Sequence, residues 1–163
     1  MRRVKSMIAG YFLTMLIFSY YFEYIVGLSP CILCEIQRYI LIPLLLFSVA
    51  LLYFNGVFGA ILRVLRQLIL VFCLFLGWHH ITLINYPSNS VVDDSCLPDI
   101  FTILKYQGFS QAWTQVLRGG PSCHKITWQL FSLSLPELTF IAYAVIFVIC
   151  YIEFFISRKS CKK

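Results

Sequence analysis

Four of the seven cysteines in this chain of 163 residues form two pairs whose spacing suits thiol chemistry. Cys31 and Cys34 make a Cys-x-x-Cys motif, and Cys96 and Cys123 enclose 26 residues. The first spacing serves redox exchange or zinc binding, and the second is typical of a structural disulfide. Two pairs in one chain also indicate thiol–disulfide exchange, because a thiolate of one pair can attack the disulfide of the other.

The Cys-x-x-Cys motif is expected in the first turns of a helix. Ser29 is the expected N-cap and Pro30 the first helical residue, both common types at these positions. The free N–H groups and the macrodipole of a helix start favour a thiolate, which is the reactive form of cysteine. Arg38 follows Cys34 by four residues and shares its helical face, so its permanent charge is also expected to favour the thiolate. These features indicate redox chemistry.

The second pair lies beside an expected surface helix. Residues 105–118 carry apolar side chains at helical spacing: Tyr106, Phe109, Trp113, Val116 and Leu117. This spacing predicts a short helix lying on the membrane surface. The segment Gly119-Gly120-Pro121 is expected to let Cys123 move, as thiol–disulfide exchange requires.

The other three cysteines are not expected to take part in the thiol chemistry. Cys73 and Cys150 lie inside apolar segments with nothing polar beside them, so both are expected to be buried small side chains. Cys161 follows the last apolar segment, where acylation or a free thiol is possible and a free thiol is expected.

The composition excludes an ordinary soluble domain. Hydrophobic residues make up 60% of the chain and charged residues 12%, against roughly 45–50% and about 25% in soluble domains; mean hydropathy is +0.83.

Four apolar segments can each cross a bilayer as a helix, with expected bounds 7–28, 30–54, 64–84 and 138–156. Pro43 is expected to kink the second. The expected fold is therefore an all-α membrane protein: a four-helix transmembrane bundle forming one domain over residues 1–163, with a short interfacial helix in its long periplasmic loop.

Basic residues gather on one side of these segments. Nine of the thirteen Lys and Arg lie at the two termini or, as expected, between the second and third spans: Arg2, Arg3, Lys5, Arg63, Arg66, Arg158, Lys159, Lys162 and Lys163. The positive-inside rule makes that side cytoplasmic, so both termini are expected inside. The net charge of +6 is then a topology signal, and no nucleic-acid partner is expected. Loops 29–38 and 85–137 face outward, which places all four paired cysteines in the periplasm of a bacterium, where disulfides persist.

The order of these motifs resembles the bacterial disulfide-bond formation family DsbB over nearly the whole chain. The resemblance rests on four spans and on these residues: Pro30-Cys31-Ile32-Leu33-Cys34, Arg38, Tyr86-Pro87, Cys96, Cys123, Trp128 and Leu135-Pro136. In the otherwise similar vitamin K epoxide reductase proteins, the loop cysteines precede the Cys-x-x-Cys motif. The resemblance implies an enzyme of the bacterial inner membrane that takes electrons from a periplasmic DsbA-like oxidase with a thioredoxin fold. It passes them to a membrane quinone, either ubiquinone or menaquinone.

The resemblance also implies a catalytic role for each paired cysteine. Cys96 would form the mixed disulfide with the DsbA-like partner, and Cys123 would be its disulfide partner. Displaced Cys123 would then attack the Cys31–Cys34 disulfide at Cys31. This attack would release Cys34 as the thiolate that interacts with the quinone.

Three charged or ionisable side chains accompany these cysteines. The resemblance makes Arg38 a quinone-binding residue together with Cys34, and His80 matches a family position near the quinone. Taken alone, His79 and His80 suit interfacial polar side chains. Glu23 in the first span is costly in hydrocarbon and is a candidate for function or helix pairing, although we expect it simply to reach the interface.

A quinone suits the energetics of the final acceptor. A DsbA-like oxidant has a potential of about −120 mV, and a thioredoxin-like couple lies about 150 mV lower. Passing electrons down to that couple would be unfavourable by roughly 7 kcal/mol. A lipid-soluble quinone supplies the drive and can meet a Cys-x-x-Cys motif at the bilayer surface.

Two other classes of protein fit part of the pattern. A zinc-binding membrane protein would use the four paired cysteines, or His124, as tetrahedral ligands. A structural tetraspan would use the outer cysteines only to brace its loops. The redox interpretation expects no metal ligand, so zinc content separates it from the first class, and loss of activity in Arg38→Ala separates it from the second.

Overall fold

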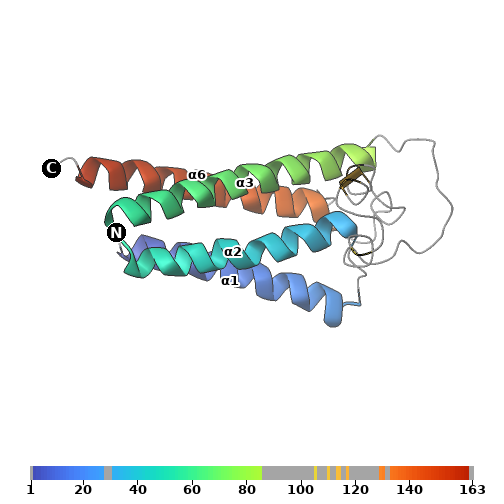
Figure 1. Ribbon diagram of the computed structural model, residues 1–163. Coiled ribbons are helices and arrows are strands. Elements are labelled where there is room, and N and C mark those ends of the chain that lie inside the picture. The colour runs from blue at the N-terminus through green and yellow to red at the C-terminus, as the bar shows by residue number, and fades with distance from the viewer. Residues whose placement is uncertain are drawn as a thin grey trace.

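The structure is a computed structural model that describes residues 2–27, 31–85, 129–130 and 133–161, together with residues 105, 110, 113, 114 and 117. Its body is formed by α1 (Arg2–Tyr24), α2 (Ile32–Tyr53), α3 (Gly56–Asn85) and α6 (Leu135–Cys161). These helices run side by side in an elongated bundle, with both chain ends at the same end of it (Figure 1). A small antiparallel pair, β1 (Gln129–Leu130) and β2 (Leu133–Ser134), precedes α6. The expected helical bundle is therefore confirmed.

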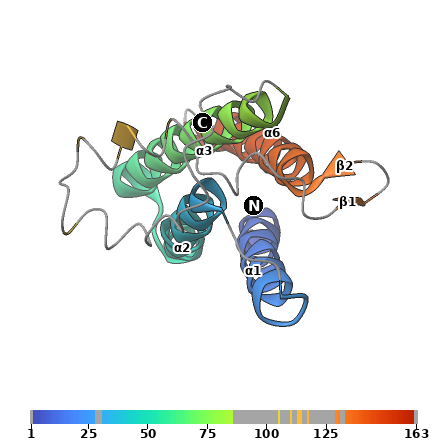
Figure 2. The ribbon, with the colours of Figure 1, turned by 90° about the vertical axis from the view of Figure 1, so that its right-hand side faces the viewer.

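The four helices form two layers. Seen along the bundle, α1 lies beside α2, and α3 crosses α6 (Figure 2). Contacts of α2 with α3 and of α1 with α6 join the two layers. The core between them contains Phe12, Leu44, Leu70 and Ile146, while large apolar side chains such as Met7 and Val57 point outward. Apolar side chains on both the inside and the outside are typical of helices in a lipid environment.

Three of the described helices can cross a membrane. The spans Ile32–Tyr53, Gly56–Asn85 and Leu135–Arg158 are each long and apolar enough, which defines a multi-pass membrane protein. Helix α1 has 23 residues but carries several charged residues, so it is less apolar. Its crossing of the bilayer stays a prediction. Pro43 lies inside α2, as expected.

The third helix begins much earlier than the hydropathy indicates. We expected a span over 64–84 and counted Arg63 and Arg66 with the connection between the second and third spans, but α3 begins at Gly56 and contains both arginines. Phe54 caps α2 by donating its N–H to Ala50 O at 2.9 Å, and Gly56 has a φ of +76°. Glycine permits this left-handed backbone, so the chain reverses within two residues. The placement of the two arginines between helices was therefore wrong.

The other helix bounds also differ from the expected ones, and α2 covers Ile32–Tyr53 instead of 30–54. Helix α1 begins at Arg2 and ends at Tyr24 instead of covering 7–28. Helix α6 covers Leu135–Cys161 instead of 138–156.

The expected interfacial helix over 105–118 lies largely outside the described residues. The described ones are all helical: Lys105, Ser110, Trp113, Thr114 and Leu117. Trp113 stacks on Phe72 of α3, with ring centroids 6.2 Å apart. Nε2 of His79 lies 2.6 Å from the Leu117 carbonyl oxygen. Trp113 and Leu117 therefore pack against α3.

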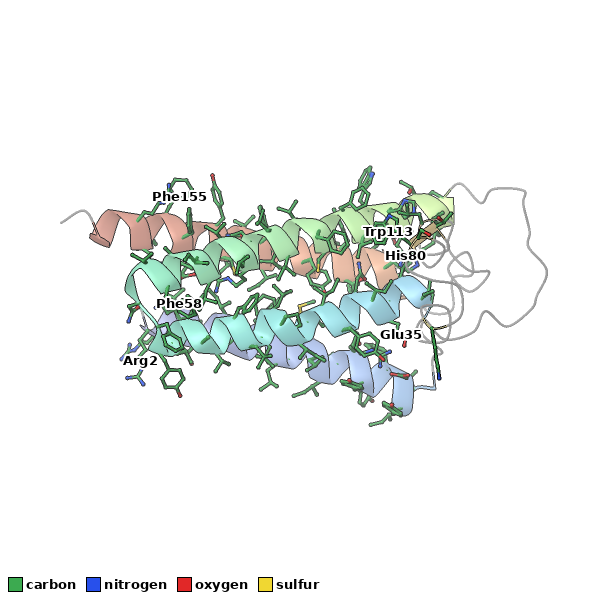
Figure 3. All side chains as sticks on the ribbon, in the orientation of Figure 1. Arg2, Glu35, Phe58, His80, Trp113 and Phe155 are labelled. Atoms are coloured by element: carbon green, nitrogen blue, oxygen red, sulfur yellow. The ribbon has the colours of Figure 1, made fainter. Side chains whose placement is uncertain are left out.

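The bundle has two ends of different chemistry. The sulfur end holds Cys31, Cys34 and His80, and the terminal end holds Arg2 and the α2–α3 turn. Figure 3 labels Glu35, His80 and Trp113 toward the first end, and Arg2, Phe58 and Phe155 toward the second.

Candidate functional site

The Cys-x-x-Cys motif lies at the start of α2, but the helix begins later than expected. Cys31 is the N-cap, with extended backbone at φ −74° and ψ 162°, and its Sγ accepts a hydrogen bond from Cys34 N–H at 3.4 Å. The expectation of Ser29 as N-cap and Pro30 as first helical residue was therefore wrong; both lie outside the described residues. A cysteine sulfur occupies the position usually taken by a serine or aspartate oxygen.

The two sulfurs and a histidine form a compact cluster. Cys31 Sγ and Cys34 Sγ are free thiols 3.2 Å apart. From α3, His80 Nε2 lies 3.5 Å from Cys31 Sγ, and His80 Nδ1 lies 3.9 Å from Cys34 Sγ. Cys31 and His80 are 6% and 2% exposed, whereas Cys34 is half-buried. An imidazole here can exchange a proton with a thiol and, when protonated, stabilise a thiolate.

His80 is thus the site residue whose role the sequence pattern alone predicted least well. The sequence suits an interfacial polar side chain, and only the family resemblance placed His80 near the chemistry. In the structure it is buried between α2 and α3 and contacts both sulfurs. His79, its neighbour, points instead to the described part of the surface segment, at Leu117.

Arg38 is held by the first helix. Its Nη1 donates to Glu23 Oε2, and its guanidinium carbon lies 5.1 Å from the centre of the Tyr20 ring. The arginine side chain is only 8% exposed, so it needs a counter-charge. The expectation that Glu23 simply reaches the interface was therefore wrong, because the carboxylate pairs with Arg38 across the α1–α2 contact.

Gln37 is a buried polar residue that the sequence analysis did not assign to the site. It is 5% exposed, and its Nε2 has no hydrogen-bond partner among the described residues. A Cβ added at Gly77 of α3 would lie 3.5 Å from this Nε2. Gln37 follows Cys34 by three residues, and Gly77 precedes His80 by three, so each shares a helical face with a site residue. The signal in the sequence that could have identified Gln37 is a polar amide side chain inside an otherwise apolar segment.

The structure does not describe the second cysteine pair. Cys96, Cys123 and His124 lie outside the described residues, so their expected roles stay predictions. Cys73 and Cys150 are both 0% exposed and belong to the apolar core, which confirms the expectation of buried small side chains. The side chain of Cys161 also lies outside the described residues.

Fold and site together define a class: a helical multi-pass membrane protein with two free thiols and a histidine at one end of its bundle. Residues 1–152 match the family described as "Disulfide bond formation protein DsbB". This chain therefore belongs to the DsbB family, as the order of its motifs predicted.

Curated relatives carry the same name. Disulfide bond formation protein B 1 of Pseudomonas aeruginosa is 33% identical over 132 residues, which cover 76% of this chain and 77% of the relative. Disulfide bond formation protein B 2 of Pseudomonas putida is 34% identical over 146 residues, covering 84% and 80%. Disulfide bond formation protein B of Paracidovorax citrulli is 30% identical over 146 residues, covering 88% and 81%. These matches support a role in disulfide bond formation.

Proposed function

We propose that this protein is a thiol–disulfide oxidoreductase that reoxidises a periplasmic DsbA-like thioredoxin-fold oxidase and passes the electrons to a membrane quinone. The observation that carries the proposal is the cluster of Cys31, Cys34 and His80 at one end of a membrane bundle, with Arg38 buried nearby. We also place the protein in the bacterial inner membrane, with both termini cytoplasmic and the sulfur end periplasmic.

Electrons enter through the loop pair. A thiolate of the partner attacks Cys96 and breaks the Cys96–Cys123 disulfide. Cys123 then attacks Cys31 and breaks the Cys31–Cys34 disulfide, so Cys34 leaves as a thiolate. The second thiolate of the partner closes the partner's own disulfide and releases Cys96. Attack of Cys96 on Cys123 restores the loop disulfide and frees Cys31, so two electrons have moved to the Cys31–Cys34 pair.

The Cys31–Cys34 pair then has to lose two electrons and two protons. His80 lies next to both sulfurs and is placed to take the proton of Cys31 and to stabilise the Cys34 thiolate. A membrane quinone, as the second substrate, accepts both electrons and both protons and leaves the disulfide re-formed.

The residues around the sulfurs fit a ligand with carbonyl oxygens. Arg38 offers a buried cation with several N–H donors, and Gln37 Nε2 is a buried donor without a partner among the described residues. An unpaired buried N–H is costly, so an acceptor at that position would be stabilising. Glu23 and Tyr20 hold the guanidinium from α1 and so fix its orientation.

The test is anaerobic. Purified protein is mixed with a reduced DsbA-like partner and one equivalent of a short-chain quinone, and quinone absorbance and partner thiols are followed together. Stoichiometric loss of both, absent in Cys34→Ser, is expected. If quinone and thiols both persist, although each reagent is shown to be competent, the proposed function is wrong.

A zinc site is a second candidate function, and one observation favours it. Cys31 Sγ, Cys34 Sγ and a ring nitrogen of His80 lie within 4.8 Å of one another, so they offer three of the four ligands that zinc takes. Metal analysis of protein purified without chelator separates the two candidates. Stoichiometric zinc that is lost in His80→Ala would support the metal site, and metal-free protein that reduces the quinone would exclude it.

A further inference from the structure

The terminal end of the bundle buries several cations around one carboxylate. Arg66 Nη2 of α3 donates to Glu153 Oε2 of α6, and Arg63 Nε lies 3.3 Å from Glu153 Oε1. Lys5 of α1 is a third buried cation at this end. It donates to the Leu51 carbonyl oxygen at 2.7 Å and to Asn55 Oδ1 at 2.9 Å, so both of these partners are uncharged.

The positive charge at this end exceeds the negative charge. The structure describes three further carboxylates, those of Glu23, Glu35 and Glu137, and all of them lie toward the sulfur end. Glu153 therefore stands alone against Lys5 and the two arginines in the described part of the terminal end. Among the buried groups of this end, three cations and one carboxylate leave an excess of two positive charges.

The two arginines also keep unused hydrogen-bond donors. Arg63 Nε lies near Glu153 but lacks the geometry of a hydrogen bond, and Arg66 Nε and Nη1 have no partner among the described residues. The two side chains are only 9% and 1% exposed. Buried charges with unsatisfied donors are costly, and Arg63 lines a pocket whereas Arg66 does not, so binding of an anion beside Arg63 would be stabilising.

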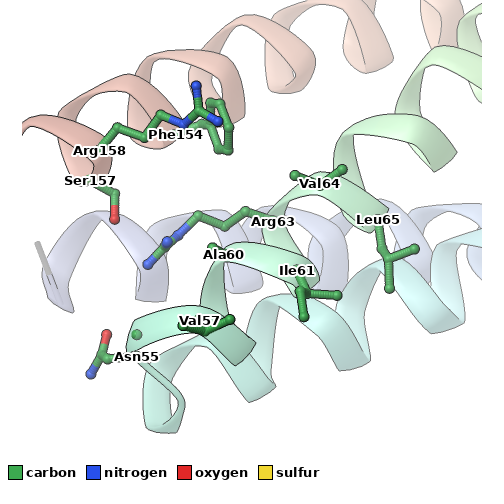
Figure 4. Close-up of a pocket in the computed structure, with 11 residues that line it drawn as sticks. Asn55, Val57, Ala60, Ile61, Arg63, Val64, Leu65, Phe154, Ser157 and Arg158 are labelled. Carbon is green, nitrogen blue, oxygen red and sulfur yellow. The ribbon is translucent and has the colours of Figure 1, made fainter. Parts of the chain in front are cut away.

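A pocket of about 520 Å³ opens at Arg63, between the start of α3 and the end of α6 (Figure 4). Its polar lining is Arg63, Arg158, Asn55 and Ser157. In Figure 4 the guanidinium of Arg63 reaches across the pocket toward Ser157 and Asn55. Arg158 is exposed and its guanidinium lies over the ring of Phe154, 4.8 Å from the ring centre. An anion in the pocket would meet the buried Arg63 directly, and Arg158 would reach it by leaving the Phe154 ring, since its guanidinium is turned away from that of Arg63 in Figure 4.

The remaining wall of the pocket is apolar and continues onto the lipid-facing side of α3. Val57, Ile61 and Val64 line the pocket and are 80%, 51% and 44% exposed. A free inorganic anion gains nothing from such a wall, whereas an amphiphile can lay its chains along it. The shape and chemistry suit a charged headgroup with hydrocarbon attached.

We propose that this pocket binds the headgroup phosphate of an anionic phospholipid, with Arg63 and Arg158 as phosphate ligands and the acyl chains lying along α3. Arginines in a basic pocket between transmembrane helices are suited to phosphate oxygens, which accept paired N–H bonds. The proposal does not depend on the redox function, because the pocket and the sulfurs lie at opposite ends of the bundle.

The test measures lipid binding to the purified full chain in detergent. Tm is followed during titration with dioleoylphosphatidylglycerol, with dioleoylphosphatidylcholine and with inorganic phosphate. The expected result is a saturable rise in Tm with phosphatidylglycerol alone, reduced at high salt because exposed charges are screened. An equal rise with phosphatidylcholine, or with inorganic phosphate at the same concentration, overturns the proposal.

Three variants locate the effect. Arg63→Gln removes the buried cation and is expected to weaken phosphatidylglycerol binding about tenfold or more. Ala60→Trp fills the pocket from an exposed lining position and leaves every charge in place, so it tests the site even if Arg63→Gln fails to fold. Arg3→Gln removes an exposed cation outside the pocket and is expected to bind like the parent. Unchanged binding in Ala60→Trp contradicts the proposed site.

Discussion

The two ends of the bundle both bury arginine, but they balance its charge differently. At the sulfur end one arginine, Arg38, meets one carboxylate, Glu23. At the terminal end Arg63 and Arg66 share the single carboxylate of Glu153. The first pair is locally neutral, and the second group keeps a net positive charge.

This difference matches what each end is proposed to do. A neutral ion pair holds the Arg38 guanidinium in place without adding net charge, so its remaining donors stay available to a neutral ligand such as a quinone. An uncompensated positive group attracts an anion and also opposes transfer of that end across the membrane. The comparison therefore separates a site that orients a substrate from a site that anchors the protein at a lipid surface.

The largest effect is expected from the sulfurs themselves. Cys31→Ala should abolish steady turnover, a loss of about a thousandfold or more, because no disulfide can re-form with Cys34. The variant should still oxidise about one equivalent of the partner through Cys96 and Cys123. A stopped-flow assay of partner thiols shows this burst.

A matched control comes from the core. Cys150→Ala changes a fully buried sulfur in the C-terminal half of α6 and should leave turnover intact. Steady turnover in Cys31→Ala, or its loss in Cys150→Ala, would contradict the assignment of chemistry to the sulfur end.

The next effect tests the charge balance directly. Glu153→Gln leaves two buried arginines without a carboxylate, so the free energy of unfolding should fall by about 3–5 kcal/mol. Glu23→Gln leaves only Arg38 unpaired, beside a carboxylate that was 26% exposed, so its cost should be clearly smaller. Unfolding of both variants in a denaturing detergent, followed by circular dichroism, measures the difference. Equal costs would show that the two ends do not differ as described.

The helical bundle and the start of α3 show where sequence reasoning succeeded and where it failed. Long apolar segments and the clustering of basic residues were sufficient for the helical bundle, because the bilayer restricts a chain to few arrangements. Hydropathy could not locate the start of α3 at Gly56, because arginines lower hydropathy whether they lie in a loop or are buried in a helix. Only the partner on a distant helix, Glu153, distinguishes the two cases.

The features of the site also divide into those that local sequence predicts and those that it does not. The position of the Cys-x-x-Cys motif at a helix start follows from local sequence, although the N-cap is Cys31 and not Ser29 as expected. The pairing of Arg38 with Glu23 and the approach of His80 to both sulfurs depend on which helix faces meet. Packing between helices sets those contacts, and a single sequence contains no direct record of it.

A smaller effect is expected when the side chain at position 38 keeps its positive charge but loses the planar guanidinium group. Arg38→Lys should weaken the apparent affinity for the quinone about tenfold to a hundredfold, because a compact ammonium cannot keep Glu23 and still offer donors in a planar fork. Steady-state kinetics with varied quinone concentration measure this change. An unchanged KM in Arg38→Lys would contradict the role given to Arg38 in quinone binding.

The smallest effects come from two glycines of α3, one toward each end. A Cβ at Gly77 would lie 3.0 Å from Cδ2 of Phe140, a side chain that can rotate away. A Cβ at Gly59 would lie 2.8 Å from the Phe54 carbonyl oxygen, which belongs to the backbone of the tight α2–α3 turn. Gly77→Ala should therefore cost about 1 kcal/mol of unfolding free energy, and Gly59→Ala should cost more, because overpacking is worst where the neighbour cannot move. Gly10→Ala, with nothing within 4 Å, is the control and should be neutral or stabilising. If Gly77→Ala costs more than Gly59→Ala, the packing around Gln37 at the sulfur end is more rigid than the turn, and the amide of Gln37 is then fixed in position before any ligand binds.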